Sequence, residues 1–196
     1  MKAKEIILQK TAGLLLERGF GNVSVSDIQQ HTGMARGLLY HYFGNQDRLF
    51  EDAVRMLAEQ WAVHKETLKN HSIAELVVFL LGKYRQLAEK LPEIAPPGGA
   101  LYRIPLLLSQ ASGQSEAMAA LYAELNEQRR SVWKTAVLNS FMRNELRSGL
   151  NLESVTRHFF FLEGGIWPQG RILSHSTDLL YVLDRTWNEY FEIIRR

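Results

Sequence analysis

Residues 31–50 read HTGMARGLLYHYFGNQDRLF, and this stretch decides how the rest of the chain is interpreted. Four ring-bearing residues stand in a row from Tyr40 to Phe43, shortly after a glycine at position 33. A helix buried on all sides would not alternate polar and aromatic side chains in this way, and a solvated loop would not carry so many rings. The rings therefore require a role other than plain core packing.

A longer amphipathic helix is predicted ahead of this stretch. In EIILQKTAGLLLERGF, residues 5–20, apolar side chains recur at the spacing of one helix face. Gly19 follows a basic residue and is expected to end the helix as a left-handed cap, with Phe20 folding back on it. The predicted apolar face consists of Ile7, Thr11, Leu14 and Leu15.

Two short helices follow. Ser24 is predicted to cap the first, over about residues 25–31, with Asp27 near the positive end of its dipole. Gly33 ends the turn after it, and a second short helix is predicted over about residues 35–42. Such a pair behind a longer helix forms a helix-turn-helix arrangement, although an ordinary three-helix packing unit without nucleic acid would produce the same spacing.

From Ile7 to Phe50 the chain resembles the N-terminal domain of the TetR family of transcriptional regulators. The resemblance implies an all-α fold, with an N-terminal three-helix helix-turn-helix DNA-binding domain over residues 1–48. A C-terminal helical ligand-binding and dimerisation bundle would occupy residues 49–196. The likeness rests on the Gly19–Phe20 pair, the spacing from Val25 to Ile28, Gly33, the run GLLYHYF at residues 37–43, and Leu49–Phe50.

The resemblance gives the aromatic run a role, because the third helix of this family lies in the major groove of DNA. By this analogy Arg36 reads guanine O6 and N7 with its paired donors. Tyr40 and His41 donate to phosphate oxygens, which position the protein without specifying sequence, whereas Leu39 and Phe43 point inward. The implied DNA-binding residues are Ser24, Ala35, Arg36, Gly37, Leu38, Tyr40, His41 and Gln46.

Three positions depart from the family pattern. Ala35 stands where a capping Ser or Thr is common, and Leu38 stands where a small or hydroxylated residue is common. Gln46 stands where the family very often has a lysine that grips the DNA backbone. Each departure removes a polar or charged contact. The sequence therefore predicts modest affinity for phosphate, or compensation from the N-terminal lysines, which are Lys2, Lys4 and Lys10.

Composition and charge indicate where a polyanion would bind, at the N-terminal end, rather than whether one binds. The net charge is only +2 over 196 residues, and that excess lies within residues 1–48, which hold six Lys or Arg against four acidic residues. No cysteine is present, so disulfides and thiolate metal sites are excluded. The longest apolar runs are too short to span a bilayer, and residues 1–10 lack the apolar core of a signal peptide. A cytoplasmic protein without membrane partners is expected.

The rest of the chain is predicted to be a helical bundle. Residues 72–75 form a capping box that opens a helix, and this helix is predicted to stop at Pro92. The run EIAPPGG at residues 93–99 is the clearest helix breaker in the chain. A long amphipathic helix is predicted over about residues 116–147, followed by one capped at Asn151 and a last one from about Asp178.

Two features of this bundle indicate function. Rings with polar edges recur in its middle helices, and pockets between helices are built from such residues, although a plain packed core uses them too. The candidate effector-pocket residues are Trp61, Phe79, Tyr84, Tyr102, Tyr122 and Trp133.

The second feature is the run of three phenylalanines at residues 159–161, which cannot all point into one narrow core. A second buried face is expected, either in a partner interface or in a helix central to the monomer. The resemblance implies a homodimer through the last two helices. The candidate interface residues are Phe159, Phe160, Gly164, Trp187 and Phe191.

The predicted function is a ligand-responsive DNA-binding transcriptional regulator, a repressor released from a palindromic double-stranded DNA operator by a small-molecule effector. No HExxH, GxSxG, P-loop or dinucleotide-binding glycine motif occurs in the sequence. No catalytic residue, cofactor or metal is expected. Two alternatives stay open at this point, a constitutive DNA-binding protein without an effector and a helical-bundle enzyme.

Overall fold

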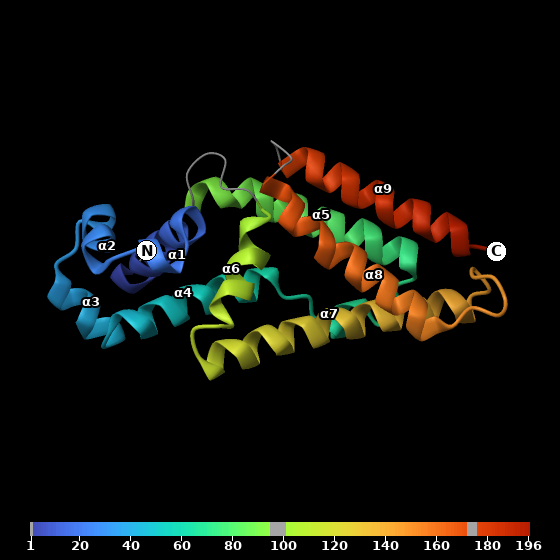
Figure 1. Cartoon of the computed structure of the whole chain (residues 1–196), viewed down its shortest axis with the longest axis horizontal. Helices are drawn as coiled ribbons and strands as arrows, with labels where there is room; N and C mark the ends of the chain where they lie inside the picture. Colours follow the sequence, from blue (N-terminus) through green and yellow to red (C-terminus); the bar gives the residue numbers. More distant parts are fainter. Residues whose placement is uncertain (1, 95–100, 172–175) are drawn as a thin grey trace. The chain divides into compact units, whose positions relative to one another are not determined.

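The computed structural model describes residues 2–94, 101–171 and 176–196, so residues 95–99 of the predicted breaker lie outside the described residues. Within these ranges the chain is helical, as predicted, and the described residues form no extended strand (Figure 1). Nor does any described helix combine the length and apolar character that crossing a membrane requires. The helices are α1 Ala3–Arg18, α2 Val25–Thr32, α3 Arg36–Phe43, α4 Gln46–Trp61, α5 Ile73–Ile94, α6 Arg103–Ala111, α7 Glu116–Met142, α8 Leu152–Ile166 and α9 Ser176–Ile194, with 3₁₀ turns at Phe20–Asn22, Lys65–Leu68 and Trp167–Arg171.

Packing divides the chain into two compact units. Unit 1 consists of Met1–Trp61 and Glu89–Tyr122, and unit 2 consists of Ala62–Ala88 and Ala123–Arg196. The predicted boundary at residue 48 separates a DNA-binding domain from a ligand-binding and dimerisation bundle. It concerns function rather than packing, and it stays a prediction.

Unit 1 is built around α1, which contacts α2, α4 and α6. Ile7, Leu14 and Leu15 are buried, which is the apolar face that the sequence predicts. Burying each of these side chains stabilises the folded state by about 1.5–3 kcal/mol. This burial therefore fixes α2 and α4 against α1. Helices α2 and α4 therefore share α1 as a rigid support.

Local capping sets the limits of α2. The backbone N–H of Asp27 donates to Ser24 Oγ at 3.2 Å, and the backbone N–H of Ser24 donates to Asp27 Oδ2 at 2.8 Å, which confirms the predicted cap. Gly33 ends the helix with φ +68°, a left-handed conformation that glycine adopts without strain. Hydrogen bonds from Ser24, followed by Arg18 at 3.0 Å, lower the pKa of Asp27, so this carboxylate stays charged near the helix N-terminus.

Three predicted helix ends differ from the structure. Gly19 has the expected positive φ of +77°, but its ψ of 170° lies outside the left-handed helical region, and Phe20 packs edge-on against Phe50 of α4. Helix α5 continues past Pro92 to Ile94, because a proline near a C-terminus removes only one N–H bond of the helix. Helix α7 ends at Met142 rather than near residue 147, because Asn144 takes a positive φ of +59°.

Predicted caps in unit 2 are confirmed. The backbone N–H of Ser72 donates to Glu75 Oε2 at 2.7 Å, and the N–H of Glu75 donates to Ser72 Oγ at 3.3 Å, which is a capping box. At the start of α8, Asn151 Oδ1 accepts from the N–H of Ser154 at 2.9 Å. Side chains therefore satisfy backbone donors at both helix starts.

The core of unit 2 contains a buried charge. Glu163 of α8 lies 2.9 Å from Arg129 Nη1, and the two side chains are only 4% and 8% exposed. Trp133 Nε1 donates to the second carboxylate oxygen at 2.8 Å. The hydroxyl of Tyr84 donates to Glu163 and accepts from Arg129 at 2.7 Å. One carboxylate thus joins α5, α7 and α8.

Protonation states agree with this network. Burial raises the pKa of Tyr84 well above its ordinary value, so its hydroxyl keeps the proton that it donates. Burial by itself lowers the pKa of Arg129, but the charge of Glu163 and the contact with Tyr84 outweigh it and raise that pKa overall. The guanidinium therefore stays charged in the core.

Replacing Glu163 by alanine should destabilise the protein by about 3–5 kcal/mol, because it leaves the buried charge of Arg129 unpaired. The matched control is Glu127→Ala, which removes an exposed carboxylate 3.0 Å from Arg130 and should cost about 1 kcal/mol or less. Urea unfolding followed by circular dichroism measures both. Equal losses in the two variants would show that the buried network does not stabilise the fold.

Candidate functional site

Helix α3 has one buried and one exposed face. Leu39 and Phe43 are buried, as the sequence predicts, and they hold the helix against its support. Arg36, Gly37 and His41 are exposed on the other side. In the ribbon view α3 lies at the margin of unit 1, with α4 running away from its end (Figure 1). The exposed face is therefore free to approach a partner.

Arg36 and Tyr40 form a pair one helical turn apart on this face. Arg36 Nη2 and Nε donate to the hydroxyl of Tyr40 at 3.0 and 3.3 Å, and the guanidinium carbon lies 5.3 Å from the ring centroid. The sequence treated the two residues as independent contacts. In the structure the Tyr40 hydroxyl orients the guanidinium and can still donate its own hydrogen to an acceptor.

The remaining predicted contacts surround this pair. Ala35 precedes α3 in an extended conformation without a side-chain cap, and Leu38 is half-buried. A Cβ at Gly37 would meet no described atom within 4 Å, so helix packing does not require this glycine. Ser24 is exposed, and its hydroxyl is already engaged with Asp27 in the cap. Contact of these residues with DNA stays a prediction.

Gln46 has a structural role in addition to its predicted one. Its Nε2 donates to the carbonyl of Val23 at 3.2 Å, which ties the first residue of α4 to the segment before α2. Asn45 caps α4 by accepting from the backbone N–H of Arg48 at 2.8 Å. The side chain of Gln46 is therefore held in place, half-buried, at the start of the helix.

Two surface residues were missed by sequence reasoning. Tyr42 is 39% exposed, and its ring lies 5.4 Å from that of His41. Arg48 is exposed in the first turn of α4, and its guanidinium lies beside Gly44. A cation two positions after Gln46 was visible in the sequence and places charge near the position where the family has lysine.

The six candidate pocket residues are divided between the two units. Trp61, Tyr102 and Tyr122 belong to unit 1. In unit 2, Tyr84 and Trp133 are both bound to buried Glu163. Phe79 is partly exposed, with its ring 6.0 Å from that of His71. Two of the six are therefore core residues with satisfied polar atoms.

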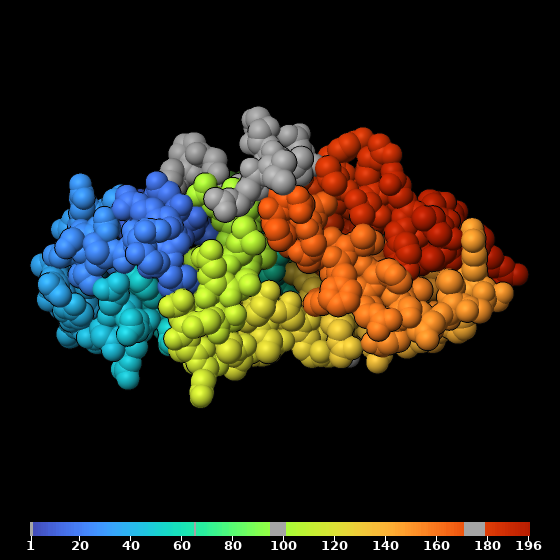
Figure 2. Space-filling model, in the orientation of Figure 1, coloured from blue at the N-terminus to red at the C-terminus, as the bar shows by residue number. Residues whose placement is uncertain are grey.

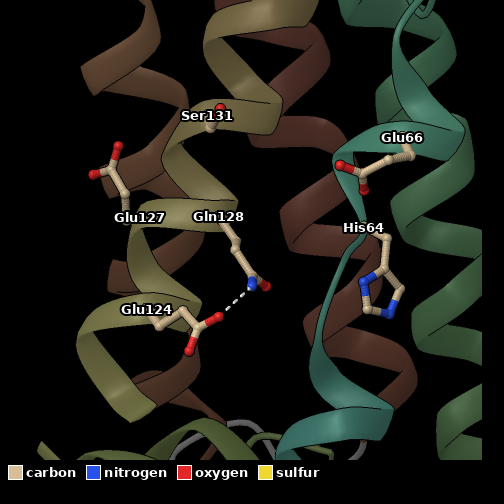
Figure 3. A pocket seen from close by; sticks show the side chains of 6 residues that line it. All are labelled: His64, Glu66, Glu124, Glu127, Gln128 and Ser131. Carbon is tan, nitrogen blue, oxygen red and sulfur yellow. Dashed lines mark hydrogen bonds between the residues drawn. The ribbon is translucent and has the colours of Figure 1, made fainter. Parts of the chain in front are cut away.

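A concave site in unit 2 has different walls. It encloses about 400 Å³ between α7 and the segment around the 3₁₀ turn Lys65–Leu68 (Figure 3). Its polar lining was not anticipated, because only aromatic residues had been weighed as pocket walls. The spacing of four between Glu124 and Gln128, and between Glu127 and Ser131, was the available signal. The lining residues are His64, Glu66, Glu124, Glu127, Gln128 and Ser131.

Three of the five candidate interface residues are buried within their own chain. Phe159 stacks on Trp133 at 4.8 Å, and Trp187 meets the same ring edge-on at 5.2 Å. Phe191 is also buried. These side chains face the core because the aromatic cluster around Trp133 requires them, which corrects the prediction that they lie at an interface.

Other apolar groups of α8 and α9 do reach the surface. Phe160 is half-buried and Gly164 is exposed. Phe161 and Tyr181 are 62% and 60% exposed. The two helices pack directly against each other, and their surfaces adjoin in the space-filling view (Figure 2). An exposed face with these rings is available for a partner.

Helices α2 and α3, joined by the turn at Gly33, have the helix-turn-helix arrangement that the sequence predicts, and α3 buries Leu39 and Phe43 while its other face exposes Arg36 and His41. Residues 7–53 match the family described as bacterial regulatory proteins, tetR family. A TetR transcription regulator from Haloarcula marismortui has the same fold, with a TM-score of 0.76 and 18% identity over 99% of this chain and 98% of that one. The N-terminal part of the chain is therefore similar to the DNA-binding domain of tetR regulators, and the chain as a whole shares the fold of a solved TetR regulator.

Other relatives share parts of the sequence or the fold. An uncharacterized HTH-type transcriptional regulator of Mycobacterium tuberculosis is 36% identical over 86 residues, which is 42% of each protein. The HTH-type transcriptional repressor AcnR of Corynebacterium efficiens is 27% identical over 82 residues, or 39% of each. The chain thus spans less than half the length of these curated relatives. A regulator from Saccharomonospora viridis in complex with choline has a TM-score of 0.74 and 16% identity, over 99% of this chain and 98% of that one.

Replacing Gln46 by lysine should tighten binding to all DNA and steepen its salt dependence. Each added contact between a cation and a phosphate makes log K fall by roughly 0.9 more per unit of log salt. The lysine ammonium can also donate to the Val23 carbonyl, so the fold should persist. Fluorescence anisotropy across a salt series, on one fixed duplex, measures the slope.

The matched control is Gln114→Lys, which adds the same charge at an exposed position after α6. It should leave the slope unchanged. If Gln46→Lys behaves like the control, Gln46 does not face a phosphate and the docking geometry of the family does not hold at this position.

Proposed function

We propose that this protein is a cytoplasmic transcriptional repressor that binds a palindromic operator as a homodimer and releases it when a small molecule occupies unit 2. The observation that carries this proposal is the exposed face of α3, where Arg36 and Tyr40 form an oriented pair. The repressor among the relatives supports the direction of control, and the site enclosed by unit 2 supports a ligand. We therefore assign this protein to the transcriptional regulators rather than to the enzymes.

Arg36 is assigned to base reading and Tyr40 to positioning. A guanidinium held by a hydroxyl loses less conformational freedom when it binds guanine, because its orientation is already restricted. His41 lies at the exposed C-terminal end of the same helix and can donate to a phosphate. Sequence preference should therefore depend on Arg36, whereas general affinity should depend on its neighbours.

Replacing Arg36 by alanine should weaken binding to the preferred sequence by about 1–3 kcal/mol and relax the preference at one base pair of each half-site. The preferred sequence is first obtained by selection from a random duplex library with the natural protein. Anisotropy then compares the selected and scrambled duplexes.

His41→Ala serves as the control, since loss of a phosphate contact should weaken binding to both duplexes alike. Equal losses on both duplexes for Arg36→Ala would show that Arg36 also contacts only the backbone.

Assembly is assigned to α8 and α9, with a second copy of this chain as the partner. The exposed rings of Phe161 and Tyr181 supply apolar area, and Gly164 allows close approach because a Cβ there would meet no described atom within 4 Å. A two-fold dimer presents two copies of α3 to successive major grooves, which requires a palindromic operator.

Replacing Phe161 by glutamate should shift the protein from dimer to monomer, because it places a charge in a desolvated interface. Sedimentation velocity at micromolar concentration measures the change. Val78→Glu is the matched control, since Val78 is 71% exposed on α5 and its replacement should leave the dimer intact. A natural protein that sediments as a monomer, yet binds a palindrome specifically, would disprove this assignment.

A further inference from the structure

The concave site in unit 2 is rich in hydrogen-bond acceptors. Three carboxylates line it, and Figure 3 shows Glu66 on one side and Glu124 on the facing part of α7, whereas the carboxylate of Glu127 points away from Glu66. The amide of Gln128 points across the space between them. The site thus places negative charge on two opposite walls.

Cations within the described residues balance only one of these charges. Arg130 lies 3.0 Å from Glu127, which lines the cavity, and 3.2 Å from Glu153, which does not, so its charge is shared between these two carboxylates. Glu66 and Glu124 have no salt-bridge partner among the side chains that the structure describes. A ligand with positive charge would compensate them.

Gln128 identifies the kind of cation. Its Nε2 donates to Glu124 Oε1 at 3.1 Å, whereas its own Oε1 is buried and has no hydrogen-bond partner among the described residues. A buried acceptor without a donor costs about 1–3 kcal/mol. A ligand that donates an N–H to this oxygen removes that cost, and a cation without N–H groups does not.

The walls also disfavour a quaternary ammonium ligand. Recognition of such cations uses aromatic faces, and none of the six lining residues is Phe, Tyr or Trp. The described residues likewise offer no cluster of ligands for a metal ion. A volume of about 400 Å³ accommodates a small organic molecule.

We propose that this site binds a protonated aliphatic di- or polyamine. One ammonium group lies near Glu66 and another near Glu124, where its N–H also reaches Gln128 Oε1. Binding depends on the site alone. Only the further step, that the amine is the effector, rests on the proposed function.

Isothermal titration calorimetry without DNA tests the binding step, with spermidine and choline as probes. Spermidine should bind, and choline should bind at least about tenfold more weakly, since a charge-assisted hydrogen bond contributes about 1.5–3 kcal/mol and tenfold is 1.4 kcal/mol. Glu66→Gln and Glu124→Gln should each weaken spermidine about tenfold, by the same reasoning. Glu192→Gln, at an exposed position of α9, should have no effect.

Equal affinities for spermidine and choline in the natural protein would overturn the proposal without any variant. So would spermidine affinities that are unchanged in both pocket variants, since bound amine would then lie elsewhere. A pocket variant that fails to fold leaves the comparison of the two probes as the deciding measurement.

A separate experiment tests the effector role. Spermidine binds DNA directly, so its effect on DNA affinity is compared between the natural protein and Glu66→Gln at equal spermidine concentration. A larger loss of DNA affinity for the natural protein supports release. If DNA affinity falls equally in both proteins while calorimetry still detects spermidine binding, the amine site is retained and its regulatory role is rejected. If the natural protein shows no sequence-specific DNA binding, the proposed function alone is rejected.

Discussion

A carboxylate excluded from water has to be satisfied by its own chain, and the interior of unit 2 is organised by that requirement. Glu163 accepts from Trp133 and is paired with Arg129, and Tyr84 closes the network. Each donor can reach it only at one position along its helix. An apolar core of equal volume can be as stable as a buried ion pair, but apolar contacts tolerate sliding. The network therefore defines the register of α5, α7 and α8 in a way that apolar packing alone does not.

The same requirement explains why two candidate pocket residues, Tyr84 and Trp133, are core residues. A tyrosine and a tryptophan with polar edges suit a ligand cavity and a buried carboxylate equally well, and only the partner distinguishes the two. That partner lies 79 residues from Tyr84 and 30 from Trp133 in sequence. Glu163 itself stands among apolar residues, where no periodicity marks it as a core acceptor. Non-local pairing of this kind cannot be inferred from spacing.

Features determined by neighbours in sequence were predictable. The cap between Ser24 and Asp27, the left-handed Gly33 and the inward orientation of Leu39 and Phe43 all follow from local geometry. The pair formed by Arg36 and Tyr40 was within reach too, because residues four apart share a helix face. The end of α7 was not predictable, since no sequence rule requires Asn144 to adopt a positive φ. Which phenylalanine of residues 159–161 faces outward likewise depended on the position of Trp133.

Helix α7 carries residues of both the buried network and the concave site, and this limits how α7 moves when a ligand binds. Arg129 and Trp133 face the core, whereas Gln128, one residue before Arg129, and Glu124, five residues before it, line the concave site. Separating Arg129 from Glu163 would expose an unpaired buried charge, which costs several kcal/mol. A ligand that draws Glu124 and Glu66 together gains less than that from each hydrogen bond, about 1.5–3 kcal/mol. Ligand binding should therefore displace α7 together with α5 and α8 as one packed body, and leave the buried network intact.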